Sequence, residues 1–197
     1  GDGLDLKIKP VIPSESPASK VKPDLVILAT VARAIACKRP LRMRYLSVSS
    51  GAKTRDIVPV ALADSGLRWH VRAFDRLNDR FSDFVLRRIQ SAEILDPLSS
   101  EHERLAADEQ WTRIVNMDLV PHPDAEWPEG IEVDFDMREG CLKMRTRAAL
   151  AGYLLQRWSV DCSESHTLNP KQHHLWLRNP QTLYGVESAK LAPGYGD

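Results

Sequence analysis

Two short segments alternate chemically reactive side chains with apolar ones. Strand-like alternation places His70 and Arg72 on one face, and it places Tyr45 and Ser47 together in the same way. A guanidinium group donates paired hydrogen bonds and stays charged at every relevant pH, so it suits phosphate. Aromatic rings can stack on a nucleobase. These residue types would suit a phosphate-bearing ligand if they met in one pocket. The alternative is that these arginines are solvated or paired with Asp, as surface arginines commonly are.

Motifs for catalysis are missing from the sequence. It contains no GxSxG, no HExxH and no GxxxxGK[ST], so we expect no enzymatic activity. Four side chains of the types that bind zinc occur near the C-terminal end: Cys162, His166, His173 and His174. Their spacing matches no compact zinc pattern. We therefore predict no metal and no cofactor here.

Three carboxylates alternate with apolar residues further upstream, at Glu132, Asp134 and Asp136. A row of carboxylates on one strand face could hold a divalent cation. The same alternation is typical of a half-buried strand with one solvated face, which is the interpretation we adopt.

The composition indicates a globular protein with balanced charge. Lys plus Arg and Asp plus Glu both number 27, so affinity for an anion must come from local clustering of charge. Cys37, Cys141 and Cys162 form no CxxC pair, which is typical of reduced thiols in a cytoplasmic protein. No apolar run approaches a membrane span and no signal pattern opens the chain, so we expect no membrane contact.

Residues 1–23 are interpreted as an extended arm or linker. They contain four prolines, which prevent a continuous helix, and the chain begins at Gly1 rather than at Met. We expect that an N-terminal domain precedes this arm in the whole protein.

Residues 24–96 are predicted to form one helix followed by five strands. Asp24 suits a helix N-cap, apolar residues then recur at helical spacing, and the helix ends before Pro40. From Leu41 the apolar period changes to two. The predicted strands run from 41 to the turn at 49–51, then over 55–62, 67–74 and 81–86, with a last one through 94. Such an order predicts a small, highly curved antiparallel barrel.

Residues 97–197 are predicted to form a second, small α/β domain, so the whole chain is assigned to the α+β class. The expected elements are a polar helical stretch over 96–111, strands over 113–120, 131–135, 141–146 and 174–177, a short helix over 121–129, and a helix with Leu150, Leu154 and Trp158 on one face. We expect the order β-α-β-β-α-β. Because Leu175, Trp176 and Leu177 are consecutive, at least one should leave the core face and could form a dimer interface.

Five sequence pieces between residues 27 and 95 occur in an order and spacing that resemble the WYL domain family. The pieces are Tyr45-Leu46-Ser47, Arg55-x-x-x-Pro59, Trp69-His70-Val71, Arg80, and Phe84-x-Leu86-x-Arg88-Ile89. The resemblance implies a ligand-sensing module with an Sm-like or SH3-like barrel. His70 and Val71 replace the tyrosine and leucine that give the family its name. The histidine changes the hydrogen bonding of the pocket and could make it sensitive to pH.

Residues 112–179 are similar to the C-terminal extension of many WYL-domain regulators. The matching pieces are Pro121-His122-Pro123, the helix over 148–158, and Leu175-Trp176-Leu177-Arg178-Asn179. The combination most resembles the repressors of bacterial anti-phage defence systems of the BREX and CBASS types. The resemblance implies a homodimer, and operator DNA bound through an N-terminal winged helix-turn-helix that this chain lacks.

The resemblance also implies the ligand-binding residues: Tyr45, Ser47, Arg55, His70, Arg72, Arg80 and Arg88. They are expected to converge on one basic concavity that binds a nucleotide, a cyclic oligonucleotide or a single-stranded nucleic acid. Trp69 is interpreted as a core residue because of its large buried area. Two alternatives stay open: an Sm-like module that binds single-stranded nucleic acid directly and constitutively, and a purely structural dimerisation unit.

Overall fold

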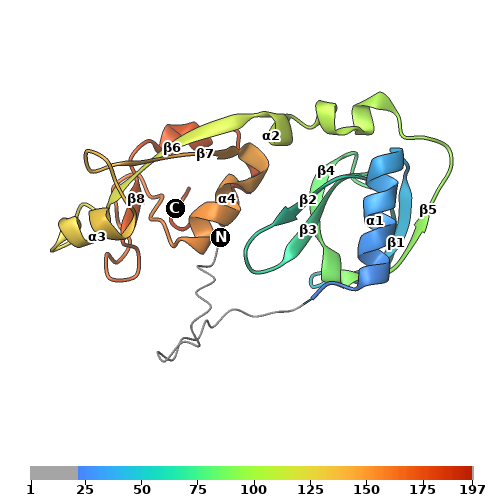
Figure 1. Cartoon of the computed structure of the whole chain (residues 1–197), viewed down its shortest axis with the longest axis horizontal. Helices are drawn as coiled ribbons and strands as arrows, with labels where there is room; N and C mark the ends of the chain where they lie inside the picture. Colours follow the sequence, from blue (N-terminus) through green and yellow to red (C-terminus); the bar gives the residue numbers. More distant parts are fainter. Residues whose placement is uncertain (1–21, 197) are drawn as a thin grey trace, which may run out of the picture.

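A computed structural model describes residues 22–196 (Figure 1). We refer to residues 22–96 as the N-terminal lobe, to 97–112 as the linker and to 113–196 as the C-terminal lobe. The arm predicted over residues 1–23 lies outside the described residues except for its last two. None of the described helices is long and apolar enough to cross a membrane.

The N-terminal lobe consists of one helix and a five-stranded antiparallel sheet. Helix α1 (Leu25–Cys37) is capped by Asp24, whose carboxylate accepts the backbone N–H groups of Val26 at 2.8 Å and Ile27 at 3.1 Å. The strands are β1 (Leu41–Ser47), β2 (Gly51–Asp64), β3 (Trp69–Asp75), β4 (Arg80–Val85) and β5 (Ile89–Ile94), in the order β4-β3-β2-β1-β5. A single 3₁₀ turn, η1 (Leu86–Arg88), joins β4 to β5.

The predicted helix and all five predicted strands are present. Strand β2 starts at Gly51, earlier than expected, because its polar first residues pair with β1. Strands β4 and β5 lie at the two ends of the order, and no pairing joins them among the described residues. The structure therefore contains the five-stranded sheet of the predicted barrel but does not show its closure.

The core of this lobe lies between α1 and the sheet. Ile27, Val31 and Ala34 form the buried face of the helix, and alternate residues of β1 are buried opposite them. Because the strand period of two puts every second side chain on that face, the intervening arginines of β1 are exposed.

The linker is a chain of short helical turns rather than one helix. It contains η2 (Glu101–Glu103), η3 (Leu105–Ala107) and α2 (Glu109–Thr112). Arg76 of the N-terminal lobe donates two hydrogen bonds to the carboxylate of Glu103, at 2.6 and 2.9 Å. The linker is thereby attached to the sheet that precedes it.

The C-terminal lobe has the element order β6 (Ile114–Pro121), α3 (Pro128–Asp134), β7 (Leu142–Arg147), α4 (Ala148–Arg157) and β8 (Leu175–Leu177). Its antiparallel sheet has the order β7-β6-β8, and two 3₁₀ turns follow, η4 (Pro180–Leu183) and η5 (Glu187–Leu191). The predicted order β-α-β-β-α-β is wrong, because the observed order is β-α-β-α-β.

The error lies in residues 121–135. Residues 121–127 of the predicted helix over 121–129 are not helical. Helix α3 begins at Pro128 and covers most of the predicted strand over 131–135. Proline suits that position because its missing N–H would have no helical partner there. In the helix Ile131 is buried while Val133 is 80% exposed, so the alternation of apolar and acidic residues does not mark two faces of a strand.

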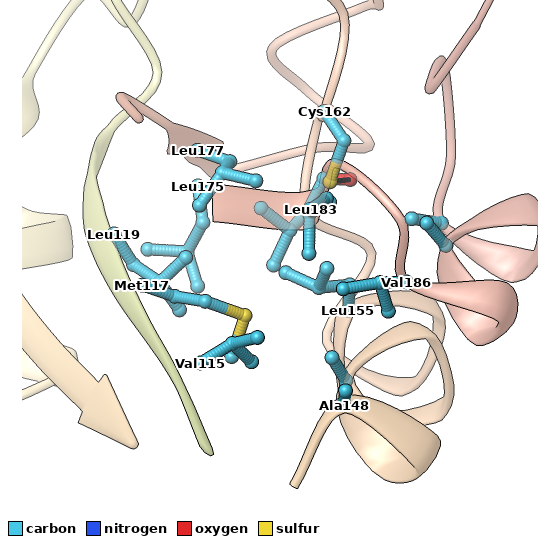
Figure 2. Close-up of a cluster of buried hydrophobic side chains, with 14 of the residues drawn as sticks. Val115, Met117, Leu119, Ala148, Leu155, Cys162, Leu175, Leu177, Leu183 and Val186 are labelled. Carbon is cyan, nitrogen blue, oxygen red and sulfur yellow. Dashed lines mark hydrogen bonds between the residues drawn. The ribbon is translucent and has the colours of Figure 1, made fainter. Parts of the chain in front are cut away.

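A second core fills the C-terminal lobe (Figure 2). Alternate residues of β6, namely Val115, Met117 and Leu119, pack against Leu155 of α4 and against both leucines of β8. The buried face of α4 consists of Ala148, Ala149, Ala151, Gly152 and Leu155. It is therefore rotated from the predicted face of Leu150, Leu154 and Trp158, which are only half-buried.

Trp176 points away from the core face of β8, whereas Leu175 and Leu177 are buried in the core. This alternation was expected for three consecutive apolar residues in a strand. The indole N–H of Trp176 donates to the carbonyl of Ser163 at 2.9 Å, and its ring lies edge-on to His166. The side chain is thus half-covered within its own lobe. Its part in a dimer interface stays a prediction.

Candidate functional site

A cavity of about 730 Å³ lies between the sheet of the N-terminal lobe and helix α4. One wall comes from β1, β3, β4 and η1, another from the turn between β2 and β3, and a third from the second half of α4. The β2–β3 hairpin extends towards α4 in Figure 1. The cavity is within the roughly 300–1,000 Å³ that is usual for small-molecule sites.

Three of the predicted site residues line this cavity: Tyr45, His70 and Arg88. The hydroxyl of Tyr45 accepts the backbone N–H of Val85 at 3.1 Å, which ties β1 to the end of β4. The ring of His70 lies 4.9 Å from the ring of Tyr153 of α4. Arg88 is half-buried at the end of η1. Each of these residues lies on or beside a paired strand, which sets the position of its backbone.

The other four predicted residues do not converge there. Arg72 and Arg80 line a separate cavity of about 220 Å³, which shares Asp83 and Tyr153 with the larger one. Arg55 lines a different surface hollow, together with Arg42 and Arg76. Ser47 lines none of these cavities, and its hydroxyl lies 3.0 Å from that of Ser49. The single concavity expected for all seven residues is therefore not what the structure contains.

Arg72 is held by carboxylates in the interior. Its Nε and Nη2 donate to both oxygens of Asp108 at 2.7 and 3.0 Å, and its Nη1 lies 3.4 Å from Asp83. Burial lowers the pKa of Arg72, but the bonds and charges of the two carboxylates outweigh it, so the pKa is raised overall. Since Asp108 is the N-cap of α2, Arg72 connects β3 to the linker.

Arg55 is paired as well. Its Nη1 donates to Asp75 at 2.8 Å, and its guanidinium lies 6.0 Å from the centre of the Phe84 ring. Arg55 and Arg72 are therefore paired with Asp, which is the alternative to a phosphate site that the sequence left open. Arg80 is exposed.

Most residues of the larger cavity were missed from the sequence, among them the polar side chains of Arg68, Asp83, Tyr153 and Arg157. The Tyr153 hydroxyl donates to Asp83 at 3.1 Å, which links the two lobes. Arg157 lies against Gly66, where an added Cβ would overlap the guanidinium and where φ is +82°. No local signal in the sequence marks Tyr153 or Arg157, because they reach the cavity only when α4 packs beside the first sheet. The sequence predicts a turn at Gly66, but it does not predict that Arg157 packs against this glycine.

The cavity is basic around a neutral histidine. Arg68, Arg88 and Arg157 all line it, and none of the three forms a salt bridge within residues 22–196. Burial lowers the pKa of His70, and the charges of Arg68 and Arg88 lower it further against the opposing effect of Asp83. Burial also raises the pKa of Tyr153, so its hydroxyl remains a hydrogen-bond donor.

Trp69 does not belong to the core, contrary to prediction. Its side chain is 42% exposed at the start of β3, where Trp69 pairs with Asp64 beside the β2–β3 turn.

Among the described residues, no group of three or more His, Cys, Asp or Glu side chains is arranged to hold a metal ion. Cys162 is buried beside Asp161, and the Nδ1 of His173 lies 2.8 Å from the carbonyl of Ser159. His122 accepts the N–H of Asp124 at Nδ1, so its Nε2 carries the proton and donates to Asp161 at 3.1 Å. These groups hold the loop structure of the C-terminal lobe together.

Comparison with known families agrees with this division. Residues 26–94 match the WYL domain, and residues 114–183 match the C-terminal dimerization domain of the BrxR transcriptional regulator. The chain is a WYL domain joined to a BrxR-type dimerization domain. The large cavity thus lies between the WYL domain and the dimerization domain, and both contribute to its walls.

Curated relatives match most of this chain. The DNA-binding transcriptional repressor CapW of Escherichia coli (strain KTE188) is 30% identical over 167 residues, which is 83% of this chain and 54% of that protein. The CapW repressor of Stenotrophomonas maltophilia is 32% identical over 177 residues, covering 85% of this chain and 56% of that protein. These names are those of repressors rather than enzymes, in agreement with the expectation of no catalytic function. The chain spans little more than half the length of these relatives.

Among solved structures, proteasome accessory factor B/C of Arthrobacter aurescens is 18% identical, with a TM-score of 0.36. The match covers 83% of this chain and 26% of that one. A likeness at this level carries no argument about function.

Proposed function

We propose that this chain is the ligand-sensing and dimerising region of a cytoplasmic, homodimeric transcriptional repressor, of the kind associated with bacterial anti-phage defence. In this proposal the WYL sheet forms an Sm-like barrel, and operator DNA is bound by an N-terminal domain of the whole protein. The effector is a nucleotide, a cyclic oligonucleotide or a single-stranded nucleic acid in the large cavity. The names of the CapW relatives and the matched dimerization domain support the repressor part.

The observation that carries the ligand proposal is a group of three guanidinium groups around one cavity without carboxylate partners in residues 22–196. Arg68, Arg88 and Arg157 come from a turn, from η1 and from α4, so they approach the space from different sides. Guanidinium forks bind phosphate oxygens with paired hydrogen bonds. Cations gathered around one hollow favour a polyanionic ligand over a neutral one, and Arg68 and Arg157 are exposed to an incoming ligand.

The aromatic side chains of the cavity complete this argument. The rings of His70 and Tyr153 line the cavity beside the arginines, and aromatic side chains can stack on any nucleobase. Because His70 stays neutral near pH 7, it does not add charge and can accept or donate one hydrogen bond. Such a site suits a ligand that carries both phosphate and base.

Because α4 of the dimerization domain forms one wall, a ligand would contact both lobes. A ligand shifts a conformational equilibrium only by as much as its affinities for the two states differ. Contacts to Arg157 depend on the position of α4, whereas contacts to Arg88 do not. Binding would therefore favour one relative placement of the two lobes.

The test is calorimetric titration of the chain with nucleotides, cyclic dinucleotides and short single-stranded DNA. Arg88→Ala and Arg157→Ala should each weaken binding by about tenfold or more, because each removes a charged hydrogen-bond donor. Arg44→Ala is the matched control, since Arg44 is exposed and donates to Gln90 on another surface. Absence of binding to every probe, or equal affinity in all variants, would refute the ligand proposal.

Two further measurements separate the alternatives. A constitutive nucleic-acid module would bind single strands tightly with a steep dependence on salt and without any change in the dimer. A purely structural unit would be dimeric in light scattering but would bind none of the probes. A monomer at high concentration would contradict the homodimer itself.

A further inference from the structure

A second cavity, of about 550 Å³, lies between β2 and the linker. Its floor is apolar and comes from β2, through Val58 and Pro59, and from the linker residues Leu105 and Trp111. No residue of the larger cavity lines it, so the two spaces are separate.

Only cations provide charge at this cavity. Lys38, Arg104 and Arg147 line it, and no Asp or Glu does. Arg147 donates to the carbonyl of Trp111 at 2.6 Å, and its guanidinium lies 5.0 Å from the centre of the Trp111 ring. Arg104 donates through Nη2 to the carbonyl of Ser99 at 2.8 Å. A carbonyl and a ring face orient these arginines, but neither neutralises their charge.

Arg104 also has an unsatisfied donor. Its Nε is buried and has no hydrogen-bond partner among the described residues, and it is the sole buried side-chain polar atom in residues 22–196 of which this is true. A buried donor without an acceptor is costly, and more so when the donor is charged. An anionic oxygen beside the guanidinium in the cavity would offset the charge to which this donor belongs.

We propose that this cavity is a binding site for a hydrophobic carboxylic acid, with the carboxylate at Arg104 and the apolar body over Val58, Pro59 and Leu105. The apolar floor favours a hydrocarbon body over a sugar or a nucleotide, because burying polar groups there would leave them unpaired. A single negative charge is easier to desolvate than a phosphate dianion. This site is independent of the proposed phosphate-bearing ligand.

The experiment uses decanoate as the probe, titrated calorimetrically into the chain below its micellar concentration. We expect saturable binding, and we expect decanamide to bind at least about tenfold more weakly, because it lacks the charge that Arg104 recognises. Arg104→Met should reduce decanoate affinity by a similar factor. Arg44→Met, on the exposed face of β1, is the matched control and should leave it unchanged.

A second variant guards against misfolding of the first. Ala106→Trp places a large side chain at the rim of the cavity from an exposed position, so it should block decanoate without disturbing the core. Arg88→Ala should bind decanoate normally, which separates this site from the ligand site. No binding, equal binding of decanoate and decanamide, or unchanged binding in both Arg104→Met and Ala106→Trp would overturn the proposal.

Discussion

Replacing Arg72 should damage the fold rather than only the affinity for a ligand. The side chain is 5% exposed, and its main partner Asp108 is 1% exposed. In Arg72→Ala the Asp108 carboxylate would keep the N–H of Trp111 but lose both guanidinium bonds, and Asp83 would lose its cation. Removing one partner of a buried ion pair costs about 3–5 kcal/mol, because the remaining charge is uncompensated.

The assay is equilibrium unfolding in urea, followed by circular dichroism. With a slope of about 2 kcal/mol per molar, a loss of 3–5 kcal/mol lowers the midpoint by roughly 2 M. Combining Arg72→Met with Asp108→Asn should recover at least half of the loss, because no uncompensated charge then remains at Asp108 and Asn still caps the helix. Arg88→Ala should change stability by no more than about 0.5 kcal/mol.

The opposite outcome would refute this reasoning. If Arg72→Ala unfolded at the wild-type midpoint and lost only ligand affinity, then Arg72 would belong to the binding machinery and the ion pair with Asp108 would be of no structural importance. A double variant no more stable than Arg72→Ala alone would likewise show that the uncompensated carboxylate is not the source of the loss.

Three further predictions follow from local geometry. Gly152→Ala should lower the free energy of unfolding by about 1–3 kcal/mol, because the new Cβ would overlap a backbone carbonyl of η5. The control Gly130→Ala in α3 places its Cβ more than 4 Å from any other atom, so it should be neutral or slightly stabilising. Equal effects of the two substitutions would contradict this prediction. Burial lowers the pKa of His70 in the folded state. The stability that the neutral ring contributes is therefore fully present above the unfolded pKa of about 6.5, and it is lost as the pH falls from that value to the folded pKa. An NMR titration of the His70 ring with a pKa above 6.5 would contradict this pH dependence. Burial raises the pKa of the Cys162 thiol to about 12, so at pH 8 a thiol reagent should modify the exposed Cys37 quickly and Cys162 only after unfolding; similar rates for both would show that Cys162 is accessible.

The fold of the N-terminal lobe was predictable because its signals are local. The cap at Asp24 and the alternation of β1 need only neighbouring residues, and both are present as expected. The error at residues 131–135 has a physical reason: five alternating residues fit a strand and a helix almost equally well, and the deciding residue is Pro128, three positions earlier.

The candidate site was only partly predictable. Tyr45, His70 and Arg88 share one cavity because strand pairing within one sheet brings them together. The partner of Arg72 is Asp108, 36 residues later in the linker, and Arg157 reaches the cavity only through packing between the lobes. Such contacts leave no period or motif in the sequence.

The ion pairs of Arg72 with Asp108 and of Arg76 with Glu103 bear on how the molecule can be divided. Both carboxylates lie beyond residue 94, where the match to the WYL domain ends. A recombinant fragment that stops near residue 96 would lack the counter-ions of Arg72, which is buried in β3, and of Arg76, which lies in the turn after β3. A fragment that extends through Thr112 would contain both Glu103 and Asp108. The part of the chain expected to fold by itself is therefore longer at its C-terminal end than the residues that match the WYL domain.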